Sequence, residues 1–431
     1  MTPRIVVGAI PSSQTAWDQR KTMIPAPFKG PLARLVKGLE IGDPRVDALP
    51  ISAVCCHGGE ARKIGMDPHP AWVNWDLVKK GQQVFKDHIG QAYVGLTFSL
   101  LQGFSISRFA EVLFHNGYAQ SAETAYERYR ETSFAIVDWM NYPLDDDNSQ
   151  AHKQIQNVRA MHSYARRRAM KLFDKSKGEG IALSQYDMAE VQLGFAGIAT
   201  DILRNEFGVK LTSEELEAWC HVWRFIGYHL GIMDEYNTCN SVEDMQAMVA
   251  EYMIYVPARF KTCRRATFEL QRTALEGFGM YTGVGVEFFS GLLHASCTSR
   301  DWGEDLDYLE RPCLPGMDHF AKAVLPLVGN NYVNKVLSFG VIHMRDVFLH
   351  HPELAKSRLP KLAALSRVND SVTWPLVAAV INFFAGRTLR KLIFGYVLGV
   401  LSTHYIAYRL IWNNMVKRIL SLVSPSSPAL Q

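Results

Sequence analysis

Apolar residues recur every three or four positions along most of this sequence from Trp72 onward. The segment 75–85 shows this pattern first, and it resumes from Tyr93 to Leu101. Such spacing places apolar side chains on one face of an α-helix, whereas a half-buried strand alternates every second residue. No stretch alternates at period two for long enough to require a sheet, and no internal repeat is visible. The sequence therefore predicts an all-α fold.

Capping residues and loop composition divide the chain. Ser184-Gln-Tyr-Asp187 and Thr212-Ser-Glu-Glu215 have the form of capping boxes, which predicts helices at about 185–206 and 213–231. Prolines and glycines punctuate residues 1–73, as in an irregular arm. We expect one multi-helix domain at 74–365 that encloses a buried cofactor pocket, and hydrophobic helices at 366–431. Further helices are expected at about 108–114, 121–140, 242–275, 285–295, 318–328 and 331–350.

Composition excludes several classes of function. The chain has 431 residues, 48% of them hydrophobic and 20% charged, with a net charge of only +4, so nothing indicates nucleic-acid binding. Its seven cysteines are odd in number and scattered, without metal-finger spacing, which is typical of reduced thiols. The first residues contain too short an apolar run for a secretory signal. We expect a protein that faces the cytosol and is not secreted.

The C-terminal part contains two uncharged apolar runs, Ser371–Gly386 and Leu392–Tyr408. Both fall short of the roughly 20 residues that span a bilayer, and Pro375, Asn382 and His404 interrupt them. Basic residues border the runs, as in helices that lie in the plane of a membrane surface. A buried or in-plane helical pair is favoured over spanning helices, and contact with a membrane surface stays an open alternative.

The sequence lacks the motifs of several common enzyme classes. It contains no Gly-x-Gly-x-x-Gly after a strand, no phosphate-binding Gly-x-x-x-x-Gly-Lys, no His-Glu-x-x-His and no Gly-x-Ser-x-Gly. Nicotinamide, nucleotide, zincin and esterase chemistries therefore have no support from motifs. What remains is histidine, arginine and threonine on apolar helices, which suit a cofactor pocket between helices.

One such helix is expected at Val158–Arg168. Arg159 lies one turn before His162 and Arg166 one turn after, so three cation-capable groups share a face. An imidazole can ligate iron and guanidinium groups can hold carboxylates, a combination that haem and its propionates require. The alternative from these residues alone is a solvated basic face.

A second candidate helix contains Cys220–Ile232, which is apolar almost all round and therefore expected to be buried. Its polar members His221, Arg224 and His229 then need partners. His221 and His229 lie about two turns apart, so they share a face but cannot readily chelate one metal together. The alternative to a binding role is that both histidines are core residues whose hydrogen bonds are satisfied within the protein.

Four motifs, in the same order and at similar spacing, resemble the catalytic domain shared by the fungal ER-bound oxygenase mpaB and the bacterial latex-clearing proteins, or rubber oxygenases. The resemblance covers about residues 70–240, with a helical continuation to about 365. The motifs are Trp75-Asp76-x-x-x-x-Gly-Gln-Gln-Val-Phe85, Arg128-x-x-x-Thr132, Val158-Arg159-x-Met-His162-x-x-x-Arg166 and His221-x-Trp-Arg224-Phe-Ile-Gly-Tyr228.

The resemblance implies an all-α fold around a b-type haem, with His162 as the proximal iron ligand and Arg128 and Thr132 on the distal side. It implies dioxygen-dependent cleavage of an isoprenoid carbon–carbon double bond into two carbonyl fragments. The expected substrate is a hydrophobic small molecule of secondary metabolism, with a prenylated compound as one candidate. Association with the endoplasmic reticulum membrane would follow. Arg159, Arg166 and Arg224 are the expected cofactor-binding residues.

Some positions depart from the family pattern. Glu131 stands where rubber oxygenases have a lysine, and Glu111 lies one position out of register with the glutamate that is their proposed base. His229 stands where relatives usually have an aliphatic residue. An extra histidine suggests a second hypothesis, a zinc-dependent lyase or rearrangement enzyme. It would use His162 together with His229, His221, Asp234 or Glu235 as ligands. A third is a non-catalytic, membrane-associated helical protein whose arginine-rich stretch binds lipid head groups.

Overall fold

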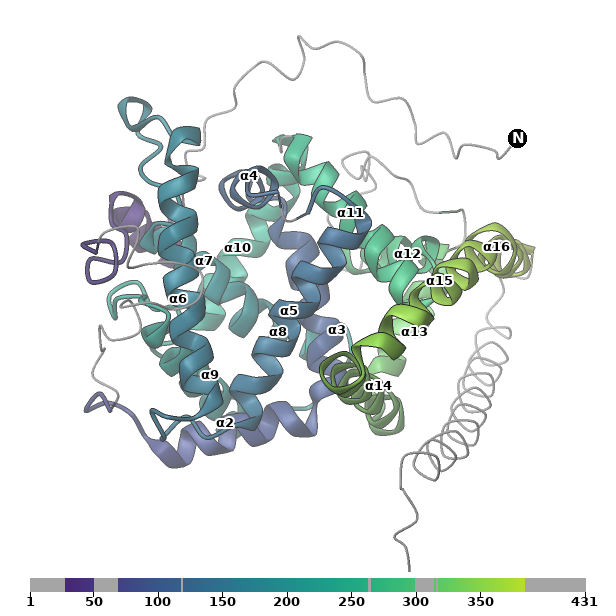
Figure 1. Cartoon of the computed structure of the whole chain (residues 1–431), viewed down its shortest axis with the longest axis horizontal. Helices are drawn as coiled ribbons and strands as arrows, with labels where there is room; N and C mark the ends of the chain where they lie inside the picture. Colours follow the sequence, from purple (N-terminus) through teal and green to yellow (C-terminus); the bar gives the residue numbers. More distant parts are fainter. Residues whose placement is uncertain are drawn as a thin grey trace, which may run out of the picture. The chain divides into compact units, whose positions relative to one another are not determined.

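The computed structural model describes residues 28–49, 69–117, 119–262, 265–298, 314 and 317–383. The chain divides into two units, Met1–Ala378 and Ala379–Gln431, and the fold and site below concern the first. The described residues form helices and turns without a strand, which confirms the all-α prediction (Figure 1). The proposed boundary of a C-terminal part at 366 stays a prediction.

The helices follow one another with short connections. In chain order they are η1 (Pro31–Glu40), α2 (Trp75–Asp87), α3 (Ile89–Gly103), α4 (Ser107–His115), α5 (Ala122–Asn141), α6 (Gln150–Ala169), α7 (Gln185–Leu193), η6 (Gly194–Ile198), α8 (Ala199–Asn205), α9 (Ser213–His229), α10 (Val242–Thr262), α11 (Arg265–Thr282), α12 (Val286–Thr298), α13 (Met317–Val328), α14 (Asn331–His350), α15 (Pro352–Val368) and α16 (Trp374–Phe383). Short 3-10 turns at Met170–Leu172 and Lys175–Lys177 follow α6, and the π-turn η8 (Asn369–Thr373) joins α15 to α16.

Both expected capping boxes are present. The Ser184 hydroxyl accepts the backbone N–H of Asp187, whose carboxylate in turn accepts the N–H of Ser184. Thr212 and Glu215 make the same reciprocal pair at the start of α9. Because these bonds satisfy N–H groups that a helix leaves unpaired, they fix where α7 and α9 begin.

Two expected helices differ from the structure. The helix expected at 185–206 is interrupted by the π-turn η6 between α7 and α8. The helix expected at 242–275 is two helices, α10 and α11, and α11 continues to Thr282. Apolar residues continue at helical spacing on both sides of each interruption, so periodicity alone does not reveal either one.

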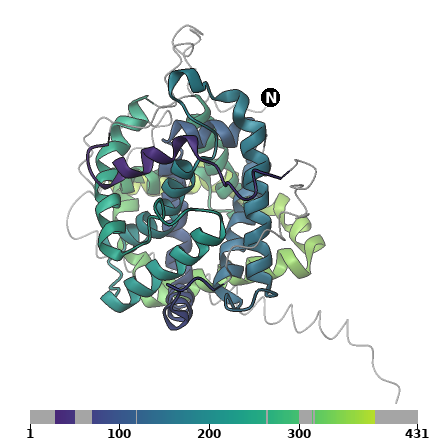
Figure 2. The same cartoon turned by 90° about the vertical axis from the view of Figure 1, so that its left-hand side faces the viewer.

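The N-terminal arm expected to be irregular contains a regular piece, the 3-10 helix η1. Pro31 occupies its first turn, where a missing N–H costs nothing. The Glu251 carboxylate of α10 accepts the N–H groups of Lys29, Gly30 and Leu32 and thereby caps η1 from another element. Figure 2 shows η1 in purple on the outside of the helices, where it packs against α7 and α10. Outside η1, the structure describes the predicted arm only at 28–30, 41–49 and 69–73, so Cys55 and Cys56 lie outside the described residues.

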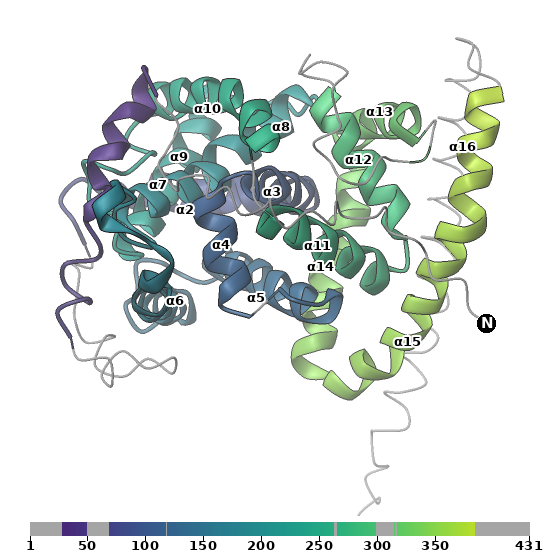
Figure 3. The same ribbon diagram turned by 90° about the horizontal axis from the view of Figure 1, so that it is seen from above.

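The core forms around α3, which contacts α8, η6 and α14 (Figure 3). α2 packs along α9, and Gly81 makes this close approach possible because a Cβ there would collide with the Ala218 carbonyl. Buried aromatic residues of α9, among them Trp219, Trp223 and Phe225, join the same hydrophobic core. α6 packs against both α5 and α9, and residues of all three helices border the site described below.

The described residues contain no helix that combines the length and the apolar character required to cross a membrane. Residues 371–383 of the first apolar run belong to η8 and α16. Residues 384–386 and all of the second run, 392–408, lie outside the described residues. Contact of the C-terminal helices with a membrane surface therefore stays a prediction.

Candidate active site

A cavity of about 330 Å³ lies between α3, α5, α6, α7, α9 and α11. This volume is within the range of small-molecule sites, roughly 300–1,000 Å³. Its wall is mostly apolar and aromatic, and its polar members come mainly from α5 and α6. Among the residues that line it are Tyr93, Leu96, Leu100, Arg128, Tyr129, Thr132, Ala135, Trp139, Gln154, Val158, His162, Phe195, Trp223 and Ile226.

His162 is one of these lining residues, and α6 presents it together with Gln154 and Val158 at intervals of one helical turn. Within the described part of the chain, its buried Nδ1 has no hydrogen-bond partner. Burial lowers the pKa of His162 to about 3, and the nearby charges of Arg128 and Arg166 act in the same direction. The imidazole is therefore neutral at physiological pH, the form in which histidine binds metals.

Arg128 and Thr132 both line the cavity from α5. The Arg128 Nη1 donates to Thr132 Oγ1 over 2.8 Å, and that hydroxyl donates in turn to the Arg128 carbonyl at 3.1 Å. In the described ranges no carboxylate lies within ion-pair distance of Arg128, although its guanidinium carries five N–H donors. This arrangement leaves a positive charge and free donors at the cavity wall.

Several other polar atoms around the cavity are buried without a hydrogen bond to any described residue. Native proteins satisfy nearly all such groups, so a cluster of exceptions indicates that a bound molecule or water completes them. Together with His162 Nδ1, the atoms are Tyr129 OH, Trp139 Nε1, Gln154 Oε1 and Trp223 Nε1. Burial raises the pKa of Tyr129, which therefore stays a neutral hydroxyl.

The structure places Arg159 and Arg166 on a different face of α6. The buried Arg159 guanidinium binds Asp43 through Nε at 2.5 Å and Nη2 at 3.0 Å. Arg166 Nη1 donates to both Asp47 oxygens, at 2.6 and 2.8 Å. We call residues 43–47 the strap. Neither arginine lines the cavity, so their cofactor-binding role stays a prediction that their positions do not favour.

Arg224 and His221 belong to α9 and contact the residues that precede α2. Neither residue lines the cavity. The Arg224 guanidinium stacks over the Trp72 ring at 4.1 Å and lies 3.6 Å from Asp234. His221 Nε2 accepts the backbone N–H of Asn74 at 2.9 Å. These contacts give both residues a part in joining α9 to α2, while cofactor binding by Arg224 and metal binding by His221 stay untested predictions.

His229 is buried beside His152 of α6, with ring centroids 4.8 Å apart, and its ring also contacts that of Phe225, with centroids 4.3 Å apart. It does not line the cavity with His162. In the part of the chain that the structure describes, no three histidine, cysteine, aspartate or glutamate side chains converge in a way that could hold a metal ion. The zinc alternative thus has no assembled three-ligand site there.

Glu111 and Glu131 take different positions. Glu111 is buried on α4, where its carboxylate lies 3.2 Å from His115 Nε2, and it does not line the cavity. Glu131 lines the cavity while its side chain is exposed, so the cavity reaches the protein surface on this side of α5. A catalytic role for Glu111 stays a prediction.

The sequence reasoning missed some residues of the site and of its support. Gln154 lies two turns before His162, so helical spacing counted back from the histidine would have identified it. Trp139 and Trp223 gave no comparable signal, because a buried tryptophan is usually part of the core. Asp43 and Asp47 stand in Gly42-Asp-Pro-Arg-Val-Asp47, a turn-like segment without a local hint of its distant arginine partners.

Comparison with solved structures finds a latex clearing protein, "Structure of Latex Clearing Protein LCP in the closed state". The identity is 19% and the TM-score is 0.46, over 73% of this chain and 84% of that chain. No curated protein sequence matches the chain.

The family comparison concerns the part of the chain that contains the site. Residues 87–326, more than half of the sequence, match "ER-bound oxygenase mpaB/B'/Rubber oxygenase, catalytic domain". This range includes Arg128, Thr132 and His162, together with the helices that enclose the cavity. The chain therefore belongs to the family of mpaB-type and rubber oxygenase catalytic domains.

Proposed function

We propose that this protein is a haem b-dependent oxygenase that oxidises a hydrophobic small molecule, with a carbon–carbon double bond as the reacting group. Membership of the family supports an oxygenase role. The observation that carries the finer proposal is that a neutral histidine and an arginine without a carboxylate partner among the described residues border the same mostly apolar cavity.

The residues of the cavity fit a haem. His162 offers a neutral imidazole, whose low pKa means that a proton does not compete with iron at physiological pH. Arg128 supplies an uncompensated guanidinium of the kind that binds carboxylates, such as haem propionates, or polarised oxygens. The apolar and aromatic wall suits a porphyrin face. When bound, haem would supply the redox centre at which dioxygen reacts.

The protein's own residues then have separate tasks. Leu96, Leu100 and Phe195 form an apolar wall that can hold an alkene and exclude water from it. Thr132 holds the Arg128 side chain through its hydroxyl, which orients the remaining guanidinium donors. Those donors would stabilise negative charge that develops on oxygen during the reaction, because fixed dipoles act strongly in a site without water.

A pair of histidine substitutions tests the assignment. We expect His162→Ala to abolish haem retention and the Soret band of the purified protein, because it removes the ligand that faces the cavity. His229→Ala is the matched control, since His229 is a buried histidine outside the cavity lining. It should retain haem. Absorption spectra, haem titration and circular dichroism of both variants provide the measurements.

The opposite ranking, with haem lost in His229→Ala and kept in His162→Ala, would remove His162 as the iron ligand. Wild-type protein that binds no haem on titration and contains stoichiometric zinc would instead support the lyase alternative.

The reaction itself requires a substrate test. A farnesylated phenol incubated with the haem-loaded protein and dioxygen should yield aldehyde and ketone fragments, which mass spectrometry can detect.

A further inference from the structure

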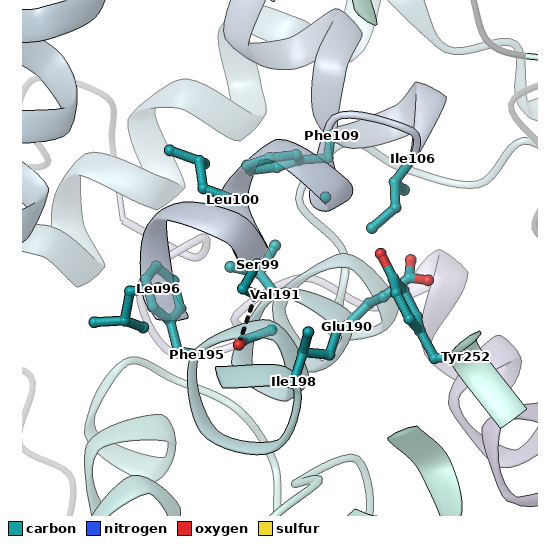
Figure 4. A pocket seen from close by; sticks show the side chains of 12 residues that line it. Leu96, Ser99, Leu100, Ile106, Phe109, Glu190, Val191, Phe195, Ile198 and Tyr252 are labelled. Atoms are coloured by element: carbon teal, nitrogen blue, oxygen red, sulfur yellow. Dashed lines mark hydrogen bonds between the residues drawn. The ribbon is translucent and has the colours of Figure 1, made fainter. Parts of the chain in front are cut away.

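A second, smaller cavity of about 40 Å³ lies beside the first, between α3, α4, α7, η6 and α10. Figure 4 shows its lining: apolar side chains such as Leu96 and Phe195 lie at one end, and Glu190 and Tyr252 lie side by side at the other. We call this space the side pocket. A space of this size can hold one or a few water-sized molecules, since one water requires about 10–15 Å³.

The side pocket adjoins the main cavity. Five residues line both spaces, namely Leu96, Leu100, Phe109, Val191 and Phe195. A single layer of apolar side chains therefore separates the two. Side chains of this kind change rotamer on short timescales, so a small molecule could pass between the spaces without any movement of the backbone.

Two glycines and the π-turn η6 keep the side pocket open. A Cβ added at Gly103 would meet only the Phe109 ring, at 3.7 and 4.0 Å, and one added at Gly194 would meet only Ser99 Oγ, at 3.2 Å. The wide turn of η6 begins at Gly194, whose carbonyl accepts the Ser99 hydroxyl at 2.7 Å. Ser99 thus binds its polar group to the backbone instead of offering it to a ligand, and π-turns of this kind occur often at functional sites.

The charge at the polar end is also compensated. Glu190 is buried and forms an ion pair with Arg259 of α10. Tyr252, whose pKa burial raises to about 12, is a neutral hydroxyl. The pocket therefore offers no net charge to an ionic ligand, and its apolar end faces the main cavity. Among the described residues, Glu190 Oε2 and Tyr252 OH have no hydrogen-bond partner, so the polar end suits a water molecule. Apolar spaces instead stay dry and take up neutral gases such as xenon, and this applies to the end lined by Leu96 and Phe195.

We propose that the side pocket binds dioxygen and supplies it to the main cavity. The inference deepens the proposed oxygenase function and rests on it for the identity of the gas. The size, the apolar end and the shared wall are the features that select a small neutral molecule over the organic substrate, which is too large for this space.

Xenon provides a probe of the pocket that does not depend on catalysis. In crystals of the full chain under xenon pressure, we expect anomalous density in the side pocket of the wild type. Gly103→Leu should abolish that density by filling the space with its side chain. Gly340→Leu is the matched control, because a Cβ at Gly340 meets nothing within 4 Å and the residue is exposed on α14.

Oxygen kinetics complete the test on haem-loaded enzyme. Gly103→Leu should raise the KM for dioxygen about tenfold, equivalent to about 1.4 kcal/mol of binding, while the KM for the organic substrate changes little. If the leucine variant folds poorly, Gly103→Ala replaces it, because its Cβ makes only ordinary contacts with Phe109. We expect a smaller rise in the KM for dioxygen in this variant.

Three results would overturn the proposal: no xenon in the wild-type pocket, ordered water that fills its apolar end beside Leu96 and Phe195, or an unchanged KM for dioxygen in a folded Gly103→Leu variant. Failure of the oxygenase function gives a different result. A protein that takes up xenon in the side pocket but binds no haem and consumes no dioxygen would retain the gas site and lose the proposed reaction.

Discussion

His221 joins two helices through a hydrogen bond that depends on its protonation state. Its Nε2 accepts the backbone N–H of Asn74, the residue that caps α2. An imidazolium has no lone pair at this nitrogen, so the contact requires the neutral ring. Burial lowers the pKa of His221 below the ordinary value of 6.5, and Arg224 acts in the same direction.

We therefore expect acid to loosen the start of α2. Because the folded-state pKa lies below the unfolded value, this stabilisation is fully present above pH 6.5 and is lost as the pH falls towards the folded pKa. Intrinsic amide exchange itself slows as the pH falls, so the quantity to compare is the protection of the Asn74 amide relative to that intrinsic rate. This protection should decrease when the pH falls from about 7.5 to about 5. His221→Gln, which can accept the same bond without titrating, should remove the effect.

Substitution of the exposed His350 by glutamine is the control, since that residue lies far from Asn74 in the chain and outside this contact. An Asn74 amide that opens equally with pH in wild type and His221→Gln would show that another group is responsible. His152 is the first to examine then, because burial lowers its pKa as well.

Sequence reasoning located individual polar residues better than their partners. Helical spacing around His162 and the Arg128–Thr132 pair could be read locally, and these residues line the cavity. The partners of Arg159 and Arg166 could not be predicted from the sequence, because Asp43 and Asp47 lie more than a hundred residues earlier in the chain. A basic helix face looks the same whether its arginines meet a cofactor, solvent or buried carboxylates.

At the scale of elements, α6 presents two functional faces. Gln154, Val158 and His162 border the cavity, while the face that carries Arg159, Ser163 and Arg166 binds the strap. Ser163 donates to Asp47 at 2.5 Å, so three successive turns of α6 bind the strap. The strap therefore fixes the orientation in which α6 presents His162 to the cavity.

Asp43→Asn should consequently destabilise the protein by about 3–5 kcal/mol, because it removes one charge of a buried ion pair. Asp145→Asn is the matched control: it breaks the ion pair with Lys79, which is largely exposed, and should cost at most about 1 kcal/mol. Urea unfolding of both variants measures the difference. Equal losses would mean that the strap contributes no more than a surface ion pair.

The helices themselves were largely predictable because apolar spacing and capping boxes are local signals. The exceptions have local physical causes that the spacing does not record. In η6 one turn widens while both flanking helices keep their apolar faces, and η1 forms because the Glu251 carboxylate of α10 caps a proline-rich segment that alone would be irregular. The helix η1 therefore depends on a contact with a residue that is distant in the sequence.

At the scale of the whole molecule, the main cavity interrupts the hydrophobic core that the helices share. Helices far apart in the sequence, from α3 to α11, contribute to its wall. An unfilled space of this kind lowers stability, since its lining lacks packing partners. A ligand that binds only the folded state raises the free energy of unfolding, by about 2.7 kcal/mol when its concentration is a hundred times its Kd.

Ala135→Phe provides the corresponding test, because Ala135 lines the cavity from the middle of α5. The added ring should occupy the space that a ligand needs, so haem binding is lost. The free energy of unfolding of the ligand-free protein should stay unchanged or rise by about 0.5–2 kcal/mol, as cavity-filling changes commonly do. Haem should then raise the melting temperature of the wild type but not of the variant, as measured by calorimetry. A variant that still gains stability from haem would place the binding site elsewhere, and one that unfolds without ligand would mean that the cavity wall cannot adjust to the ring.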